Sequence, residues 1–103
     1  MAKKTAEVTV SVDTEADLYW VALDDRELKF GDDKAKARVP LEEKLLLGWW
    51  VRGAPGSDIK IDVEAEDGYE VKGKFPIQTE IPASVSKAGG FRVFTVVKEE
   101  EEG

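Results

Sequence analysis

The chain contains neither cysteine nor histidine among its 103 residues. Without cysteine it forms no disulfide and no thiolate metal site, which suits a reducing compartment. Without histidine it lacks the commonest general base, the commonest zinc ligand and the usual pH switch near neutrality. A serine–histidine–aspartate triad is therefore excluded, and we expect no catalytic centre and no cofactor.

Basic residues are in the minority, with 15 lysines and arginines against 22 acids and a net charge of −7. A field of this sign repels phosphate backbones and anionic lipid head groups. The longest apolar run, Leu45 to Val51, is far too short to span a bilayer, and no apolar signal segment follows the N-terminus. The sequence therefore predicts a soluble protein, cytoplasmic where it is expressed, that binds neither nucleic acid nor membranes.

Apolar and polar residues alternate with a period of two along most of the chain, as on half-buried strands. β-Branched and aromatic residues, which strands favour, are concentrated in these runs. Two further segments, Leu18–Leu23 and Leu45–Val51, are apolar on both faces and predict central strands. The other expected strands are residues 8–12, 35–39, 59–65, 69–75 and 91–97, with a weaker short strand at 27–30 and an edge strand or crossing loop at 77–81.

Turn residues separate these runs. Asp67-Gly68, between two alternating runs, predicts a β-hairpin, and residues 54–57 (Ala-Pro-Gly-Ser) fit a type II turn. Pro40 followed by acids is compatible with one helical turn over residues 41–47, the alternative being a plain turn at residues 41–44.

Together these features predict an all-β fold, an immunoglobulin-like or fibronectin-like two-sheet sandwich of about seven or eight strands. A single domain is expected over residues 1–97, and the like-charged residues 98–103 predict a disordered acidic tail. Strand order, and sandwich against barrel, stay open at this point. The residues expected to carry the stability of the core are Val10, Trp49, Ile61, Val63, Val71, Phe75 and Val93.

The tandem Trp49-Trp50 is the most informative local feature. On a strand the two rings must face opposite sides. In the register that buries Trp49, Trp50 and Arg52 point outward, and either Tyr19 or Trp20 must also face outward. Outward aromatic rings stack on sugars or anchor protein partners. We therefore take Trp50, Tyr19 and Arg52 as the candidate ligand-binding residues, the alternative being that a loop or the second sheet covers the outward ring.

Acids in the expected loops are weaker candidates. Asp24-Asp25 and Asp32-Asp33 offer oxygens to Ca²⁺, which needs about six to eight, but no EF-hand spacing is present and acids are ordinary turn formers. Hydrolysis of glycosides by paired carboxylates would need a substrate cleft. The spacing of the glycines matches neither a P-loop nor a dinucleotide-binding motif. We expect no metal site, and we disfavour a small hydrolase.

Residues 49–61, WWVRGAPGSDIKI, resemble a strand–turn–strand unit of small bacterial sandwich domains, in which a tryptophan strand leads through a G-x-P-G turn into an alternating strand. The whole chain resembles an engineered or computationally designed sandwich, because lysine and glutamate fill the exposed strand positions and methionine occurs only at the start. Thermophilic proteins show the same enrichment, and the irregular loops depart from an idealised design. The resemblance implies a stable scaffold and no particular activity.

Two functions therefore lead. The first is a non-catalytic β-sandwich scaffold or interaction module. The second is a ligand-binding module that uses an outward aromatic patch to hold a carbohydrate or a peptide. The expected partner is a protein or a carbohydrate, and the expected oligomeric state is a monomer or a weak dimer.

Overall fold

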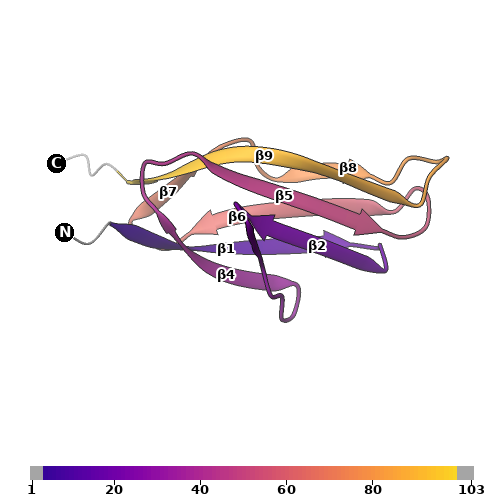
Figure 1. The fold of residues 1–103 in the computed structure, drawn as a ribbon, viewed down its shortest axis with the longest axis horizontal. Coiled ribbons are helices and arrows are strands. Elements are labelled where there is room, and N and C mark those ends of the chain that lie inside the picture. Colours follow the sequence, from indigo (N-terminus) through magenta and orange to yellow (C-terminus); the bar gives the residue numbers. More distant parts are fainter. Residues whose placement is uncertain (1–3, 100–103) are drawn as a thin grey trace.

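The structure is a computed structural model that describes residues 4–99, and every regular element in this range is a β-strand (Figure 1). No helix of this range is long and apolar enough to cross a membrane. The strands are β1 (Thr5–Thr14), β2 (Leu18–Leu23), β3 (Arg26–Glu27), β4 (Lys34–Pro40), β5 (Leu45–Arg52), β6 (Asp58–Ala65), β7 (Tyr69–Lys72), β8 (Ile77–Glu80) and β9 (Lys87–Lys98).

The strands form two antiparallel sheets, which confirms the predicted two-sheet sandwich. One sheet has the order β4-β1-β6-β8 and the other the order β3-β2-β5-β9-β7. In Figure 1 the strands β2, β5 and β9 lie in front of β1, β6 and β8. The sheets do not close on each other, so the alternative of a barrel is wrong. The nine strands of the described range exceed the seven or eight expected, because the weak strand near residue 27 (β3) and the edge strand at residues 77–81 (β8) both form.

The core lies between the sheets and is built by the apolar positions of the alternating runs. β1 alternates strictly between buried valines and more exposed polar residues, and β6 does the same with isoleucine and valine. Both predicted central strands, β2 and β5, lie inside the five-stranded sheet. The largest fully buried side chains are Phe94, Leu23, Leu45, Leu47, Ile59, Ile61, Ile81, Val8, Val10, Val21, Val39 and Val51.

Most of the predicted core residues face the interior, but Val93 does not. Val10, Ile61 and Val63 are buried. Trp49, Val71 and Phe75 are partly buried and pack against the core. The prediction for Val93 is wrong, because its side chain is 54% exposed and the last strand buries Phe94 and Val96 instead. The run from residue 91 to 97 carries apolar residues at both parities, so periodicity alone could not select its inner face.

The predicted hairpin at Asp67-Gly68 is also wrong, although the turn itself forms. The Tyr69 N–H donates to the Glu66 carbonyl at 3.1 Å, and Gly68 has a φ of 91°. However, β6 and β7 belong to different sheets, and β7 pairs with β9. In fact only β2 and β3 are consecutive strands of one sheet within the described range. Local turn chemistry fixes the reversal of the chain and leaves the pairing partner to the packing of the core.

The type II turn at residues 54–57 is confirmed. Its Ser57 N–H donates to the Ala54 carbonyl at 3.1 Å, and Gly56 has a φ of 85°. The plain turn at residues 41–44 is confirmed, and the alternative of a helical turn over residues 41–47 is wrong: Glu42 has a φ of 60°, and β5 begins at Leu45. Leu45 and Leu47 are both buried, and residues two apart share a face on a strand but not on a helix.

Several strand boundaries differ from the expected ones, most of all at β7, which ends at Lys72 and not at residue 75, and at β9, which begins at Lys87 and not at residue 91. β3 covers Arg26–Glu27 and not residues 27–30, while residues 77–81 contain the edge strand β8 and not a crossing loop. At the C-terminal end, Lys98 still pairs with Tyr69, and the Glu99 N–H donates to the Gly68 carbonyl at 2.9 Å. The rest of the predicted acidic tail, residues 100–103, lies outside the described residues.

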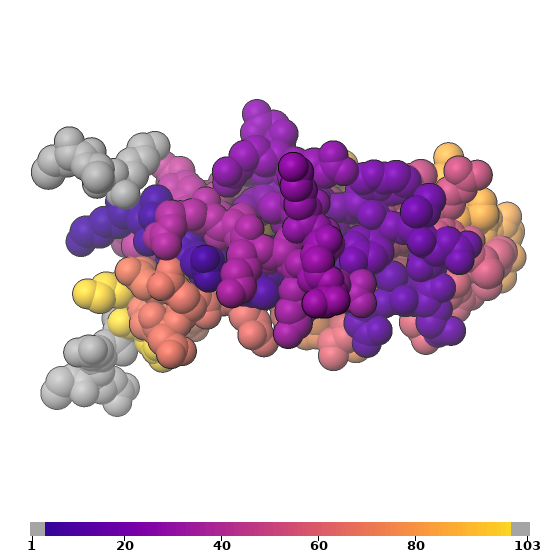
Figure 2. Space-filling model, turned by 90° about the horizontal axis from the view of Figure 1, so that it is seen from below, coloured from indigo at the N-terminus to yellow at the C-terminus, as the bar shows by residue number. Residues whose placement is uncertain are grey.

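The chain between β2 and β4 makes an excursion from one sheet to the other. The Leu28 N–H donates to the Val21 carbonyl, and Gly31 forms an isolated bridge with Lys34. Asp24, Asp32 and Asp33 all have positive φ, which aspartate tolerates better than most residues. Figure 2, seen from below, shows purple atoms of this part of the chain projecting from the middle of that side. The excursion therefore covers the flank where the two sheets would otherwise lie open.

Candidate functional site

The outer face of the four-stranded sheet is polar. Cross-strand partners on this face combine opposite charges, as at Glu7 with Arg38 and Asp13 with Lys60. The Lys36 Nζ also lies 4.0 Å from the Glu7 carboxylate. This is the ordinary outer face of a sandwich, where charges keep the sheet soluble and discourage edge pairing. The outer face of the five-stranded sheet contrasts with this polar face.

The outer face of the five-stranded sheet is apolar. Its outward positions fall on β2, β5 and β9, the central strands of that sheet. The large apolar side chains exposed there are Leu18 (50%), Trp20 (41%), Leu46 (39%), Trp50 (36%), Phe91 (76%) and Val93 (54%). The register places them in adjacent rows, with Trp20 opposite Trp50 and Leu46 opposite Val93. We call this set the apolar face. A contiguous exposed patch of this kind is typical of an interaction surface.

Trp20 and Trp50 form the centre of the apolar face. Their ring centroids are 4.6 Å apart, with an angle of 44° between the planes. The Trp50 ring extends over Gly89, where an added Cβ would lie 3.2 Å from the indole and 2.9 Å from the Trp49 carbonyl oxygen. On the inner side, Trp49 covers Gly90 in the same manner, 3.1 Å from an added Cβ. Consecutive glycines thus make room for consecutive indoles on opposite faces of the sheet.

Phe91 continues the apolar face beyond the indole pair. Its ring leans over Gly48, 3.7 Å from where a Cβ would stand. A shallow hollow of about 550 Å³ lies between Phe91 and the two indoles. Glu27 is the one charged residue of its lining. The hollow therefore offers stacking and apolar contact and few hydrogen-bonding groups.

The structure brings two of the three predicted site residues to this face. Trp50 faces outward beside Trp20, and Arg52 is exposed at the end of β5, opposite Leu18 on one side and Lys87 on the other. Tyr19 does not join them, because it has the inward parity of β2 and packs against the core. Between Tyr19 and Trp20, the outward ring is Trp20. Sequence reasoning did not find Phe91, since a phenylalanine in an apolar run is usually buried.

Tyr19 instead joins the sheet to the excursion at residues 24–33. Its hydroxyl donates to the Asp33 Oδ1 at 2.9 Å, and its ring meets Phe30 edge-on with centroids 5.2 Å apart. Burial, the hydrogen bond to Asp33 and the negative charge of that carboxylate together raise the pKa of Tyr19 from 10.0 to about 12. The phenol is therefore neutral over the whole physiological range, and its role is structural.

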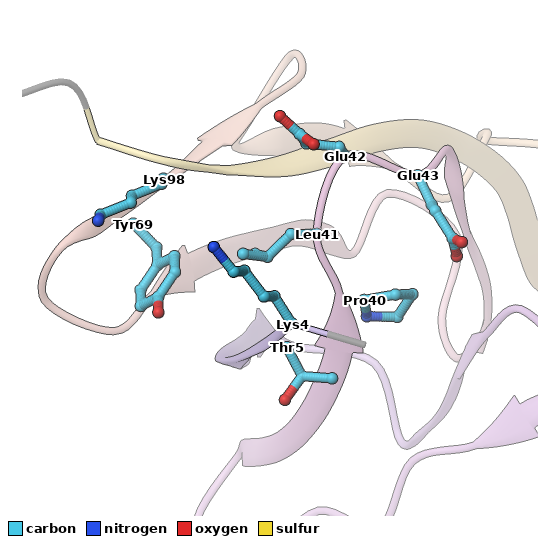
Figure 3. A pocket seen from close by; sticks show the side chains of 8 residues that line it. All are labelled: Lys4, Thr5, Pro40, Leu41, Glu42, Glu43, Tyr69 and Lys98. Carbon is cyan, nitrogen blue, oxygen red and sulfur yellow. The ribbon is translucent and has the colours of Figure 1, made fainter. Parts of the chain in front are cut away.

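A larger hollow, of about 720 Å³, lies at the end of the sandwich near both termini (Figure 3). Its lining comes from four separate segments, at residues 4–5, 40–43, 69 and 98, and mixes lysines with glutamates. Backbone hydrogen bonds tie its walls, from the Leu41 N–H to the Lys4 carbonyl and from the Glu42 N–H to the Val96 carbonyl. Flexible charges of both signs do not define one ligand, so we base no function on this hollow.

Residues 4–99 contain no group of three or more histidine, cysteine, aspartate or glutamate side chains placed to hold a metal ion. Comparison with known proteins adds no relative: no protein-family model matches the chain, and no match was found among curated proteins or solved structures. The apolar face, with the indole pair at its centre, is thus the feature on which a function has to be argued.

Proposed function

We propose that this protein is a non-catalytic interaction module that binds a protein partner through the apolar face of its five-stranded sheet. The observation that carries the proposal is the contrast between two outer faces of one sandwich. One face has paired charges, whereas the other exposes Trp20, Trp50 and Phe91. Exposed aromatic residues are enriched among those that dominate binding energy at protein interfaces.

The lining of the face favours a polypeptide over a soluble sugar. A sugar ring stacks on an indole, but its hydroxyl groups also need hydrogen-bonding partners in the site. Glu27 is the one charged residue around the hollow between Phe91 and the indoles. Apolar side chains of a protein partner need no such groups, and they gain from the area that they remove from water.

Carbohydrate binding is the second candidate, because two exposed indoles stand side by side as a stacking platform. Arg52, at the end of the platform, would then bind sugar hydroxyl groups. As a third reading, an engineered origin would make the protein a stable scaffold that presents this face. A melting temperature above about 90 °C, with no ligand for the face, would favour that reading.

The test is a selection of peptides from a displayed library against the wild-type protein, followed by titration of each selected peptide into three proteins. Wild type and Thr9→Ala, which alters the outer face of the other sheet, should bind each peptide with the same Kd. Trp50→Ala should lose about 2 kcal/mol or more, roughly thirtyfold in Kd. Circular dichroism and melting curves establish that each variant is folded.

The outcomes separate the candidates. Selected peptides that bind Trp50→Ala as tightly as wild type would overturn the proposal. Tryptophan emission titrated with cello-oligosaccharides tests the second candidate. A saturable shift that Trp50→Ala abolishes would establish carbohydrate binding in place of a protein partner.

A further inference from the structure

β9 has an open edge beside the apolar face. β7 pairs with β9 only from Thr95 to Lys98, although β9 begins at Lys87. On its other side β9 pairs with β5 along Lys87 to Phe94. Figure 1 shows β9 along the upper margin of the front sheet, with β7 beside its C-terminal part. The part of β9 from Lys87 to Phe94, about two thirds of the strand, is therefore a sheet edge.

The hydrogen bonds of β5 show which backbone groups point to this edge. Leu46 turns its N–H and carbonyl towards Asp24, beyond β2: its N–H donates to the Asp24 Oδ1, and its carbonyl accepts from the Asp24 N–H. Backbone groups alternate in direction along a strand, so Leu45 and Leu47 point towards β9 and bond Phe94 and Arg92.

The backbone groups of the intervening residues of β9 consequently point away from β5. The N–H and carbonyl groups of Gly89, Phe91 and Val93 face the open edge, in line with the Glu99 N–H that bonds Gly68. None of the loop hydrogen bonds found within residues 4–99 involves these three residues. They form a row of unpaired groups, which is a template for another strand.

The two edges of the four-stranded sheet are protected against such pairing. β4 carries Lys34, Lys36 and Arg38 along its length, and β8 is a short strand between two prolines. Charges, prolines and short edge strands are common means of preventing edge-to-edge association. The open part of β9 has two glycines and the outward side chains of Phe91 and Val93. Its edge is therefore better suited to accept a strand than the edges of β4 and β8.

The side chains around this edge are mostly basic, whereas the whole chain is acidic. The net charge of the protein is −7, yet β9 contains no acid and carries Lys87, Arg92 and Lys98. Lys72 and Lys74 lie where the chain leaves β7, and the Arg92 guanidinium donates to the Lys74 carbonyl at 3.1 Å. On β7 the opposing charge is Glu70.

We propose that β9 accepts an extended segment of a protein partner as an added antiparallel strand, and that this segment alternates apolar residues with acids. Apolar side chains of the added strand lie beside Phe91 and Val93 and enlarge the apolar face. Its acidic side chains lie on the other side, next to Arg92. A second copy of this chain is disfavoured as occupant, because β9 contains no acid that could lie beside Lys87 or Arg92 of the other copy. The inference rests on the proposed function, for which it names the partner.

The test uses a labelled octapeptide of alternating valine and glutamate, with a valine–lysine octapeptide as the charge control. Binding is measured by fluorescence anisotropy to wild type, Phe91→Ala and Phe91→Pro. The Phe91 N–H takes no part in the bonding to β5, so proline removes the donor at the edge, whereas alanine removes only the ring. We expect Phe91→Pro to bind about tenfold or more weaker than Phe91→Ala, and the lysine peptide to bind no protein.

Amide exchange of wild type supplies a readout that does not depend on the folding of a variant. The glutamate peptide should slow exchange at Gly89 and Phe91. Unchanged exchange at these amides, equal affinity of the alanine and proline variants, or equal binding of the lysine peptide would each overturn the inference. A dimer of the free protein that Phe91→Pro dissociates would also overturn it, in favour of a second copy. If Trp50→Ala alone abolishes peptide binding, the edge inference fails while the proposed function stands.

Discussion

Tyr19 and Trp20 are adjacent in the chain and lie in opposite environments. Tyr19 packs against the core and donates its hydroxyl hydrogen to Asp33, whereas Trp20 is 41% exposed on the apolar face. Because strand side chains alternate, one residue of shift would have exchanged the two roles. The register is set by the buried neighbours Val21 and Leu23, which share the parity of Tyr19.

The raised pKa of Tyr19 predicts a dependence of stability on alkaline pH. The folded protein holds the phenol proton up to about pH 12, while the unfolded chain releases it near the ordinary value of 10.0. The stabilisation by this group is therefore fully present below pH 10 and is lost as the pH rises towards 12. Between these pH values, the unfolding free energy of wild type should fall more steeply than that of Tyr19→Phe, measured by urea denaturation. Parallel pH curves of the two proteins would contradict the prediction.

Ile61 and Val93 provide a matched test of the observed core. Ile61 is fully buried in β6, whereas Val93 is 54% exposed. Ile61→Ala should destabilise the protein by about 2–5 kcal/mol, as truncations of buried isoleucine do. Val93→Ala should change stability by about 0.5 kcal/mol or less. Denaturant melts measure both, and similar losses for the two variants would mean that the face of β9 has been assigned incorrectly.

At the scale of elements, the pairing of β5 with β9 explains the glycines of the last strand. The strand expected at residues 91–97 leaves out residues 88–90, because two consecutive glycines are typical of a turn. In the structure they lie inside β9, opposite Trp49 and Trp50. The two indoles occupy the space that side chains at these positions would need, one on each face of the sheet.

This arrangement predicts that Gly89→Ala is destabilising. A Cβ there would lie 2.9 Å from the Trp49 carbonyl oxygen, so the backbone of β5 or β9 has to shift. We expect a loss of about 1–3 kcal/mol, the range of overpacked sites. Gly31→Ala is the control, since nothing lies within 4 Å of its added Cβ. Equal unfolding free energies of the two variants would show that β5 and β9 are less tightly coupled than the register implies.

Connections between elements follow the packing of the core more than the turns. Asp67-Gly68 has the sequence of a hairpin turn, yet its two flanking strands belong to different sheets. A hairpin there would leave β7 beside β6, and β9 would lose the strand that pairs its C-terminal part. Turn residues determine only the local path of the backbone. The pairing partner of a strand depends on all the strands that compete for the same sheet edge.

At the scale of the whole molecule, the main feature is the asymmetry of the two outer faces. A sandwich needs two apolar inner faces, and both sheets supply them. The polar outer face meets the solvent with paired charges such as Glu7 and Lys36, while the second outer face exposes the indole pair and Phe91. Folding does not require large exposed apolar side chains on that second face, which is why we propose it as the binding surface.

The alternation of valine and isoleucine with polar residues was sufficient to predict strands and the inward side of β1 and β6, and it favoured a two-sheet sandwich without excluding a barrel. It also predicted that Trp50 faces away from the core, because the period of two leaves no other choice once Trp49 faces inward. Only the tertiary structure decided which strands are neighbours, and hence that Trp20, Trp50 and Phe91 share one face and that β9 keeps an open edge. The physical reason is that the parity of a side chain is a local property of the backbone, whereas sheet order depends on contacts between residues far apart in the chain.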